Sequence, residues 1–217
     1  MRATGRPVRI GVALLGLAPF FALGLGVARD SLGADPPEVL LHETGEWALR
    51  WLLATLAVTP LRRLFGWSWL APHRRTFGLL AYFYACLHFT SYLVFELGFA
   101  WGELGADILE RPYITVGFST LLLLTPLAIT STRGWIRRLG RRWRQLHRLA
   151  YAAAVGGVVH FLWSVKADLS EPLFYGAIAA ALLGFRLYGN EPARASRKRE
   201  SCARLPRPEQ SPSDGAA

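Results

Sequence analysis

Five histidines are the side chains of this chain best suited to redox or metal chemistry: His42, His73, His88, His147 and His160. His88 and His160 lie inside long apolar runs, where ionisable side chains are costly and mark functional sites by default. Neutral imidazole binds iron well, and two imidazoles that face each other across a helix bundle can ligate one haem iron. His42 lies between apolar runs and is interpreted as a surface residue.

The spacing of these histidines predicts their depth in a membrane. His88 is about 12 residues into an apolar segment, and His160 follows His147 by 13 residues. At 1.5 Å per residue, both lie roughly 18–20 Å from the inner face. We therefore expect His88 and His160 to be the axial pair of one haem. His147 lies roughly 20 Å below His160, which predicts a second haem with His73 or Arg74 as its opposite partner.

Helix geometry opposes part of this interpretation. Thirteen residues of a straight helix turn His147 and His160 about 140° apart, so the two side chains would not share a face. A π-bulge or bend at Gly156 and Gly157 would reconcile them. The alternative is that each histidine only hydrogen-bonds a neighbouring helix, and for His73 a position at the membrane interface is favoured.

Six apolar segments must position these residues. The chain has 217 residues, of which 52% are hydrophobic and 18% charged, whereas soluble domains carry about 25% charged residues. This composition excludes a soluble globular domain, a coiled coil, a disordered chain and a disulfide scaffold. Because a transmembrane helix needs about 20 apolar residues, we predict an all-α, integral membrane six-helix bundle with spans at 9–28, 46–61, 76–97, 113–130, 147–165 and 172–188.

Loop charges predict the orientation of this bundle. Arginines gather before the first span, after the second and fourth spans, and in the C-terminal tail, whereas the acidic residues outside the tail occupy the alternate loops. The positive-inside rule therefore places both termini in the cytoplasm. We predict a cytoplasmic N-terminus at 1–8, a six-helix transmembrane domain at 9–188 and a disordered basic cytoplasmic tail at 189–217.

The charged residues also indicate what the chain contacts. The basic residues that give the chain its net charge of +10 lie between apolar segments. The expected partner is therefore membrane lipid and not nucleic acid. Arg50, near the outer end of the second span, is predicted to contact a haem propionate or quinone oxygen, or else to snorkel to the interface. The acidic outer loops, including Glu103, Asp107 and Glu110, predict a docking surface for a soluble protein.

Several stretches together resemble the MsrQ (YedZ) family, within the ferric-reductase-like transmembrane group that includes NADPH oxidases. They cover residues 32–188 nearly end to end: LGAD at 32–35, TG at 44–45, LLATLAVTPLRR at 52–63, RRTFGL at 74–79, LHFTSY at 87–92, RPYITVG at 111–117, TSTRGW at 130–135, LGRRWRQLHRLAY at 139–151 and HFLWSVK at 160–166.

The resemblance implies b-type haem ligation by His88, His147 and His160, in a multi-pass protein of the bacterial inner membrane. It also implies electron delivery to a periplasmic molybdopterin-dependent (MsrP-like) reductase of methionine sulfoxide, and it links the chain to FMN and quinones. The two ligands on the third helix of NADPH oxidases are 14 residues apart. Here that position is Arg74, so an inner haem has Arg74, the adjacent His73, or no residue as its partner.

We therefore expect an electron-transfer subunit of an oxidoreductase system and not a complete enzyme. No nicotinamide or FAD domain is visible, so the donor is expected to be quinol or a cytosolic flavin reductase, and one or two b-type haems carry the electrons. A stand-alone ferric or oxygen reductase of the same haem architecture is one alternative. A non-redox membrane transporter or assembly factor is the other, and it predicts a colourless protein.

Overall fold

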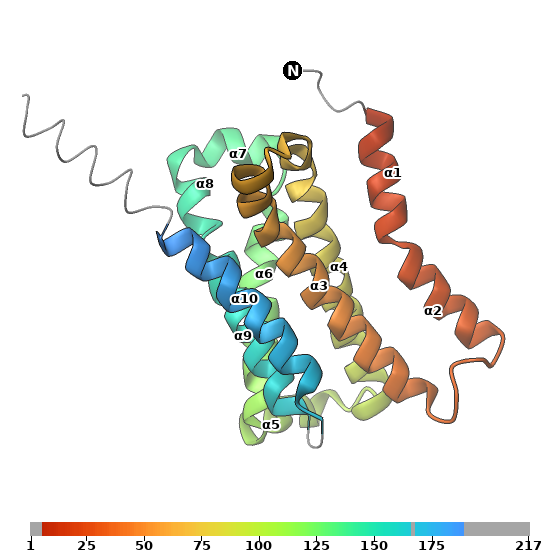
Figure 1. The fold of residues 1–217 in the computed structure, drawn as a ribbon. Helices are drawn as coiled ribbons and strands as arrows, with labels where there is room; N and C mark the ends of the chain where they lie inside the picture. Colours follow the sequence, from red (N-terminus) through yellow and green to blue (C-terminus); the bar gives the residue numbers. More distant parts are fainter. Residues whose placement is uncertain (1–5, 166–167, 189–217) are drawn as a thin grey trace, which may run out of the picture. The chain divides into compact units, whose positions relative to one another are not determined.

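The computed structural model describes residues 6–165 and 168–188, and these residues form helices and no strands (Figure 1). The all-α prediction is therefore confirmed for the described ranges. The elements, in chain order, are α1 (Arg6–Gly16), α2 (Ala18–Ala28), α3 (Pro36–Phe65), the 3₁₀ helix η1 (Ser68–His73), α4 (Arg74–Ser91), the π-helical turn η2 (Tyr92–Glu96), α5 (Trp101–Glu110), α6 (Pro112–Ile129), α7 (Arg133–Leu139), α8 (Arg141–Leu146), α9 (Leu149–Ser164) and α10 (Ser170–Tyr188).

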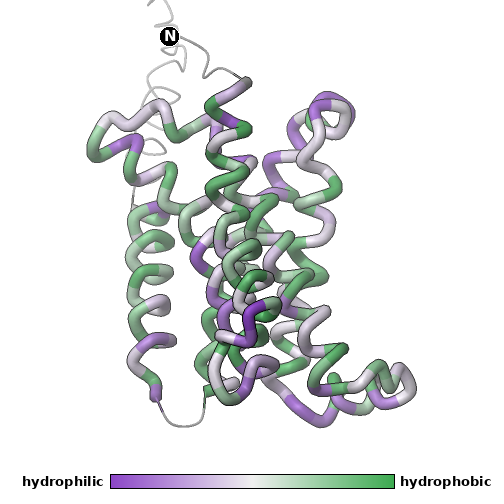
Figure 2. The backbone as a smooth tube through the Cα atoms, turned by 90° about the vertical axis from the view of Figure 1, so that its right-hand side faces the viewer, coloured by the Kyte–Doolittle hydropathy of each residue, from purple (hydrophilic) through white to green (hydrophobic). Residues whose placement is uncertain are grey.

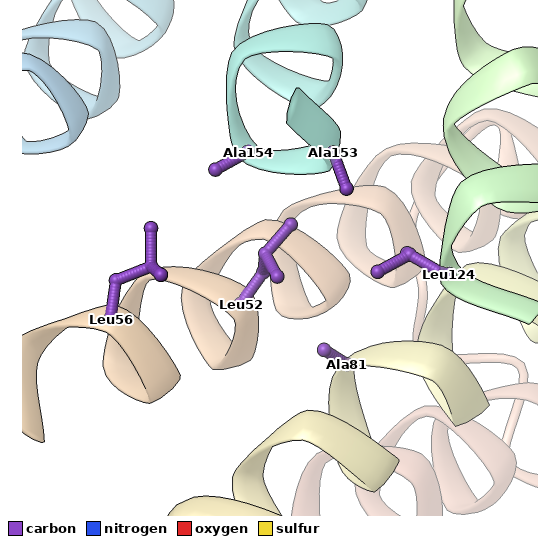
Figure 3. Packing of buried hydrophobic residues seen from close by; sticks show 6 residues of the cluster. All are labelled: Leu52, Leu56, Ala81, Leu124, Ala153 and Ala154. Carbon is purple, nitrogen blue, oxygen red and sulfur yellow. The ribbon is translucent and has the colours of Figure 1, made fainter. Parts of the chain in front are cut away.

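Four helices form the centre of the bundle, and each contacts two others in the order α3, α4, α6, α9 and back to α3. The helices α4 and α9 therefore lie across a diagonal. All four supply buried side chains to one cluster, which Figure 3 shows from close by: Leu52, Leu56, Ala81, Leu124, Ala153 and Ala154. The alanines on α4 and α9 let the leucines of α3 and α6 fill the space between the helices.

The helix α3 is longer than its apolar pattern predicts, and local signals explain both ends. The Asp35 side chain accepts a hydrogen bond from Glu38 N at 3.1 Å, and Pro36 occupies the first helical position. Both features are typical of helix starts. Gly66 ends the helix at φ 69°, a left-handed conformation that glycine adopts readily. Charged residues in its first and last turns hid these ends from the hydropathy pattern.

The N-terminal helices α1 and α2 contact the bundle through α4 and α3 (Figure 1). The helix is interrupted between them at Leu17, and Tyr84 of α4 hydrogen-bonds backbone groups on both sides of this interruption. Its buried hydroxyl donates to Gly16 O at 3.0 Å and accepts from Phe20 N at 3.1 Å. One side chain of α4 therefore fixes both halves of the first apolar segment.

Residues 6–183 belong to one compact unit, and Gly184–Tyr188 of α10 belong to a second. Within the first unit, α10 packs on α3 and α9 through the buried side chains of Leu49, Leu53, Val158 and Ala179. The predicted disordered tail at 189–217 lies outside the described residues.

Within the described ranges, three segments are long and apolar enough to cross a membrane: Pro7–Ala28, Ser68–Glu96 and Pro112–Ile129. They match the first, third and fourth predicted spans. In Figure 2 the hydrophobic colour runs mostly along the helices and the hydrophilic colour gathers at the loops. The other three predicted spans coincide with α3, α9 and α10. The six-span count and the cytoplasmic termini stay predictions, because α3 carries several charges and α9 has only 16 residues.

The π-bulge considered at Gly156 and Gly157 is not present, because α9 runs as a continuous α-helix through both residues. The π-helical turn lies instead at Tyr92–Glu96, directly after α4. His147 does not begin α9 either. It caps the C-terminal end of α8, and His147 and Arg148 are the two turn residues between α8 and α9. The 140° objection therefore does not apply, because His147 and His160 do not lie on one straight helix.

Candidate functional site

His88 of α4 and His160 of α9 face each other across the diagonal of the bundle. Their ring centroids are 5.9 Å apart, and the ring planes make an angle of 77°. Metal–imidazole bonds are about 2 Å long, so a centroid separation of this size is compatible with one metal ion between the two rings. The structure therefore brings together the two histidines that the depth argument paired.

Both rings are held in the same way by a backbone carbonyl. His88 Nδ1 lies 2.8 Å from Leu41 O of α3, and His160 Nδ1 lies 2.7 Å from Tyr113 O of α6. A carbonyl only accepts, so Nδ1 carries the proton in each ring and donates it. The lone pair of each Nε2 is then free to bind a metal. A donating second nitrogen is the usual support of a metal-bound histidine.

Two glycines make these close approaches possible. A Cβ atom on Gly45 would lie 3.0 Å from His88 Nδ1, and one on Gly117 would lie 2.7 Å from His160 Nδ1 and Cε1. Each glycine follows the accepting residue by four positions, at 41 and 45 on α3 and at 113 and 117 on α6. Gly45 and Gly117 belong to the TG and RPYITVG stretches that carry the family resemblance, but neither was predicted to be a site residue. The available signal was a lone glycine inside a helical pattern, which often marks a packing or functional position.

His147 has different surroundings. Its ring stacks on Trp143 with centroids 4.0 Å apart, and its Nε2 lies 3.2 Å from Thr130 Oγ1. Thr130 donates its own proton to Pro126 O at 2.6 Å. Its oxygen must therefore accept from His147, so Nε2 carries the proton of this ring. His147 would have to break that bond before Nε2 could bind a metal, whereas His88 and His160 would not.

Arg74 and His73, the two candidates for the residue opposite His147 at an inner haem, have different surroundings. Arg74 interacts electrostatically with His147. His73 is fully buried, with ring centroids 6.4 Å from those of both Trp69 and Phe77. Neither nitrogen of His73 has a hydrogen-bond partner within the described part of the chain. His73 is therefore enclosed by aromatic side chains, its position at the membrane interface stays a prediction, and Arg74 is the candidate that interacts with His147.

Arg50 lies near the middle of α3, where it contacts side chains of α3 and α10. Its Nε donates to the Tyr175 hydroxyl of α10 at 2.8 Å, and its guanidinium lies 4.7 Å from the Trp47 ring centroid. It also forms ion pairs with Glu46 and, at 3.9 Å, with Glu43. These contacts link α3 to α10. Contact of Arg50 with a propionate or a quinone stays a prediction.

An acidic depression lies at the helix α5, where Glu96, Glu103 and Glu110 are among the lining residues. One acid there is already paired. Asp107 accepts from the Tyr92 hydroxyl and lies 2.8 Å from Arg111 Nε. The hydrogen bond between Arg111 and Tyr113, together with this ion pair, raises the pKa of the exposed Arg111. Glu103 and Glu110 are exposed, so these two carboxylates, and not that of Asp107, present negative charge at the protein surface.

The sequence matches the family described as "Ferric reductase like transmembrane component" over residues 44–158. Curated relatives named "Protein-methionine-sulfoxide reductase heme-binding subunit MsrQ" are about half identical to it. The Rhodospirillum rubrum protein is 52% identical over 82% of this chain and 86% of its own length. The Xanthomonas euvesicatoria protein is 50% identical over 88% and 86%, and the Herminiimonas arsenicoxydans protein is 50% identical over 79% and 80%. No solved structure matches the chain.

Proposed function

This chain belongs to the MsrQ family of ferric-reductase-like transmembrane proteins, and from that premise we propose that it carries electrons across a membrane through a haem held by His88 and His160. The observation that carries the proposal is the paired geometry of the two imidazoles, in which each Nδ1 is bound to a backbone carbonyl, so that Nε2 is the nitrogen left to bind a metal. The names of the relatives include heme binding, which agrees with this donor set.

The residues around the two histidines fit such a group. A haem iron would supply one-electron chemistry, and imidazole is one of its usual protein ligands. Leu41 O and Tyr113 O orient the rings and hold the Nδ1 protons. Gly45 and Gly117 allow that approach. The apolar cluster of the four central helices excludes water from the interior. The chain thereby supplies ligation, orientation and a dry surrounding, which tune a haem's potential.

We propose that the electrons leave at the acidic outer loops to a methionine-sulfoxide reductase subunit, as the names of the relatives suggest. The predicted topology supports this direction, because it places His88 and His160 nearer the outer face. A quinol or a cytosolic flavin reductase is the proposed donor. An additional FMN or quinone site rests on the family resemblance alone.

The family description favours one alternative, a stand-alone ferric or oxygen reductase of the same architecture. The two functions differ in what reoxidises the protein. A stand-alone reductase reacts rapidly with ferric chelates or oxygen when no partner is present. An electron-transfer subunit reacts slowly with both and rapidly with the partner reductase.

Visible spectra and haem content of purified variants test the ligand assignment. We expect His88→Ala and His160→Ala each to abolish the same low-spin b-type signal, because both remove one axial ligand of one haem. His42→Ala is the matched control, since it removes a half-exposed imidazole from the same protein and should leave this signal intact. A full haem content and an unchanged spectrum in His88→Ala would overturn the assignment.

A further inference from the structure

We propose that His42, Glu46 and Glu171 bind one divalent transition-metal ion where α3 and α10 meet. One ligand atom from each of these residues lies within 4.8 Å of the other two. His42 and Glu46 are one turn apart on α3, and Glu171 comes from the first turn of α10. This site is separate from the histidine pair and does not depend on haem ligation.

The Glu46 carboxylate is the strongest indication of a ligand. Its side chain is only 4% exposed, and its Oε1 has no hydrogen-bond partner within the described residues. The same oxygen lies 3.9 Å from His42 Nδ1, so it points into the cluster. A buried carboxylate oxygen without a donor is costly. A bound cation would satisfy it.

The neighbouring arginine leaves this oxygen unsatisfied. Arg50 binds the other oxygen, Oε2, and is shared with Glu43 and with the Tyr175 hydroxyl. One guanidinium therefore faces the carboxylates of both Glu43 and Glu46. The remaining negative charge favours a further cation, and the Glu46 and Glu171 carboxylates lie close enough to interact directly.

The donor set selects the class of ion. Two carboxylates and one imidazole suit Zn²⁺, Mn²⁺ or Fe²⁺, whereas Ca²⁺ and Mg²⁺ take oxygen ligands. His42 is 48% exposed and Glu171 is exposed, so an ion can enter and water can complete its coordination. The His42 ring also contacts Phe161, the neighbour of His160, at a centroid distance of 5.8 Å.

Metal titration of the full-length, tag-free protein in detergent tests the site. After chelator treatment and desalting, Zn²⁺ is titrated against a chromogenic chelator, and Mn²⁺ is followed by loss of the free-ion EPR signal. We expect one ion per chain, without competition from excess Ca²⁺. His42→Asn and Glu171→Gln should each weaken binding by at least about tenfold. Both residues are exposed, so these variants test the proposal even if Glu46→Gln does not fold.

Glu43→Gln is the matched control. It removes one negative charge from α3 beside the same Arg50, but it removes no proposed ligand, so its affinity should stay close to that of the parent. Three results would overturn the site: no stoichiometric Zn²⁺ or Mn²⁺ binding, parental affinity in Glu171→Gln, or an equal loss in Glu43→Gln. The first result would mean that Glu46 and Glu171 share a proton instead. Haem content, recorded on the same samples, reports the proposed function separately.

Discussion

Each imidazole of the central pair depends on a glycine that leaves room for its Nδ1 beside a backbone carbonyl. In an α-helix the carbonyl of residue i accepts from the N–H of residue i+4, so a side chain at i+4 lies beside that carbonyl. At Leu41 and Tyr113 the residue at i+4 is glycine. A second donor, the histidine Nδ1, can therefore reach each carbonyl oxygen. The repeated arrangement explains why both rings use Nδ1 for the carbonyl and leave Nε2 for another partner.

We predict that Gly117→Ala disturbs the haem while the helices stay folded. The added Cβ would lie 2.7 Å from His160 Nδ1 and Cε1, so the ring must move and its bond to Tyr113 O must lengthen. Haem content or the low-spin spectrum should change, whereas circular dichroism should keep its helical signal. Alanine also has the higher helix propensity, by about 1 kcal/mol, so a loss would not reflect a weaker helix.

Gly102→Ala provides the comparison, because nothing lies within 4 Å of a Cβ at that helical position. Gly45→Ala should have a smaller effect than Gly117→Ala, since its Cβ would lie 3.0 Å from His88 Nδ1. If Gly117→Ala keeps the parental spectrum and haem content, the glycine contacts do not position the ligands.

At the scale of elements, the break between α8 and α9 decides what His147 can do. The break removes His147 from α9 and places it against Trp143 of α8 and Thr130 at the end of α6. In this position His147 either ligates an inner haem beside Arg74 or only anchors the α8–α9 junction to α6. The two roles predict different behaviour of Thr130 variants.

We predict that His147→Ala loses a second haem or slows reduction from the cytoplasmic side, while the signal of the outer pair survives. Thr130→Val should keep both haem content and reduction rate, because it removes only the hydrogen bond that occupies Nε2. Redox titration of the visible spectrum and stopped-flow reduction measure these effects. If Thr130→Val reproduces the His147→Ala defect, the histidine acts as a structural anchor and not as a ligand.

The sequence predicts where helices exist better than it predicts their ends, the short helices between them and the π-helical turn. All six apolar segments coincide with helices, because long apolar runs dominate local structure. The extra turns of α3, the π-helical turn at Tyr92–Glu96 and the short helices α5, α7 and α8 follow from capping and local hydrogen bonds that hydropathy does not register. The pairing of His88 with His160 follows from depth alone. The partners of their Nδ1 atoms do not, since they depend on which helices become neighbours.

For the whole molecule, the division of charge between alternate loops predicts both topology and partner. The basic loops are expected to face the cytoplasm and the acidic loops the periplasm. The paired Asp107 narrows the docking surface to the exposed acids of α5, Glu103 and Glu110. Replacement of Asp107 would also break its bonds to Tyr92 and Arg111, so a variant that includes it would confuse docking with folding.

We predict that Glu103→Gln combined with Glu110→Gln slows electron transfer to the partner reductase while haem spectra stay unchanged. Exposed charges steer association, and salt screens them over about 10 Å at 0.1 M. The parent rate should therefore fall as ionic strength rises, and the double variant should start low and depend less on salt. Stopped-flow reoxidation of the reduced protein by its partner measures both rates.

Neutralising Arg141 and Arg142 on the opposite side is the matched control, because it changes two exposed charges without touching the outer loops. Equal reoxidation rates of parent and outer variant at low and high salt would mean that these glutamates mark topology only.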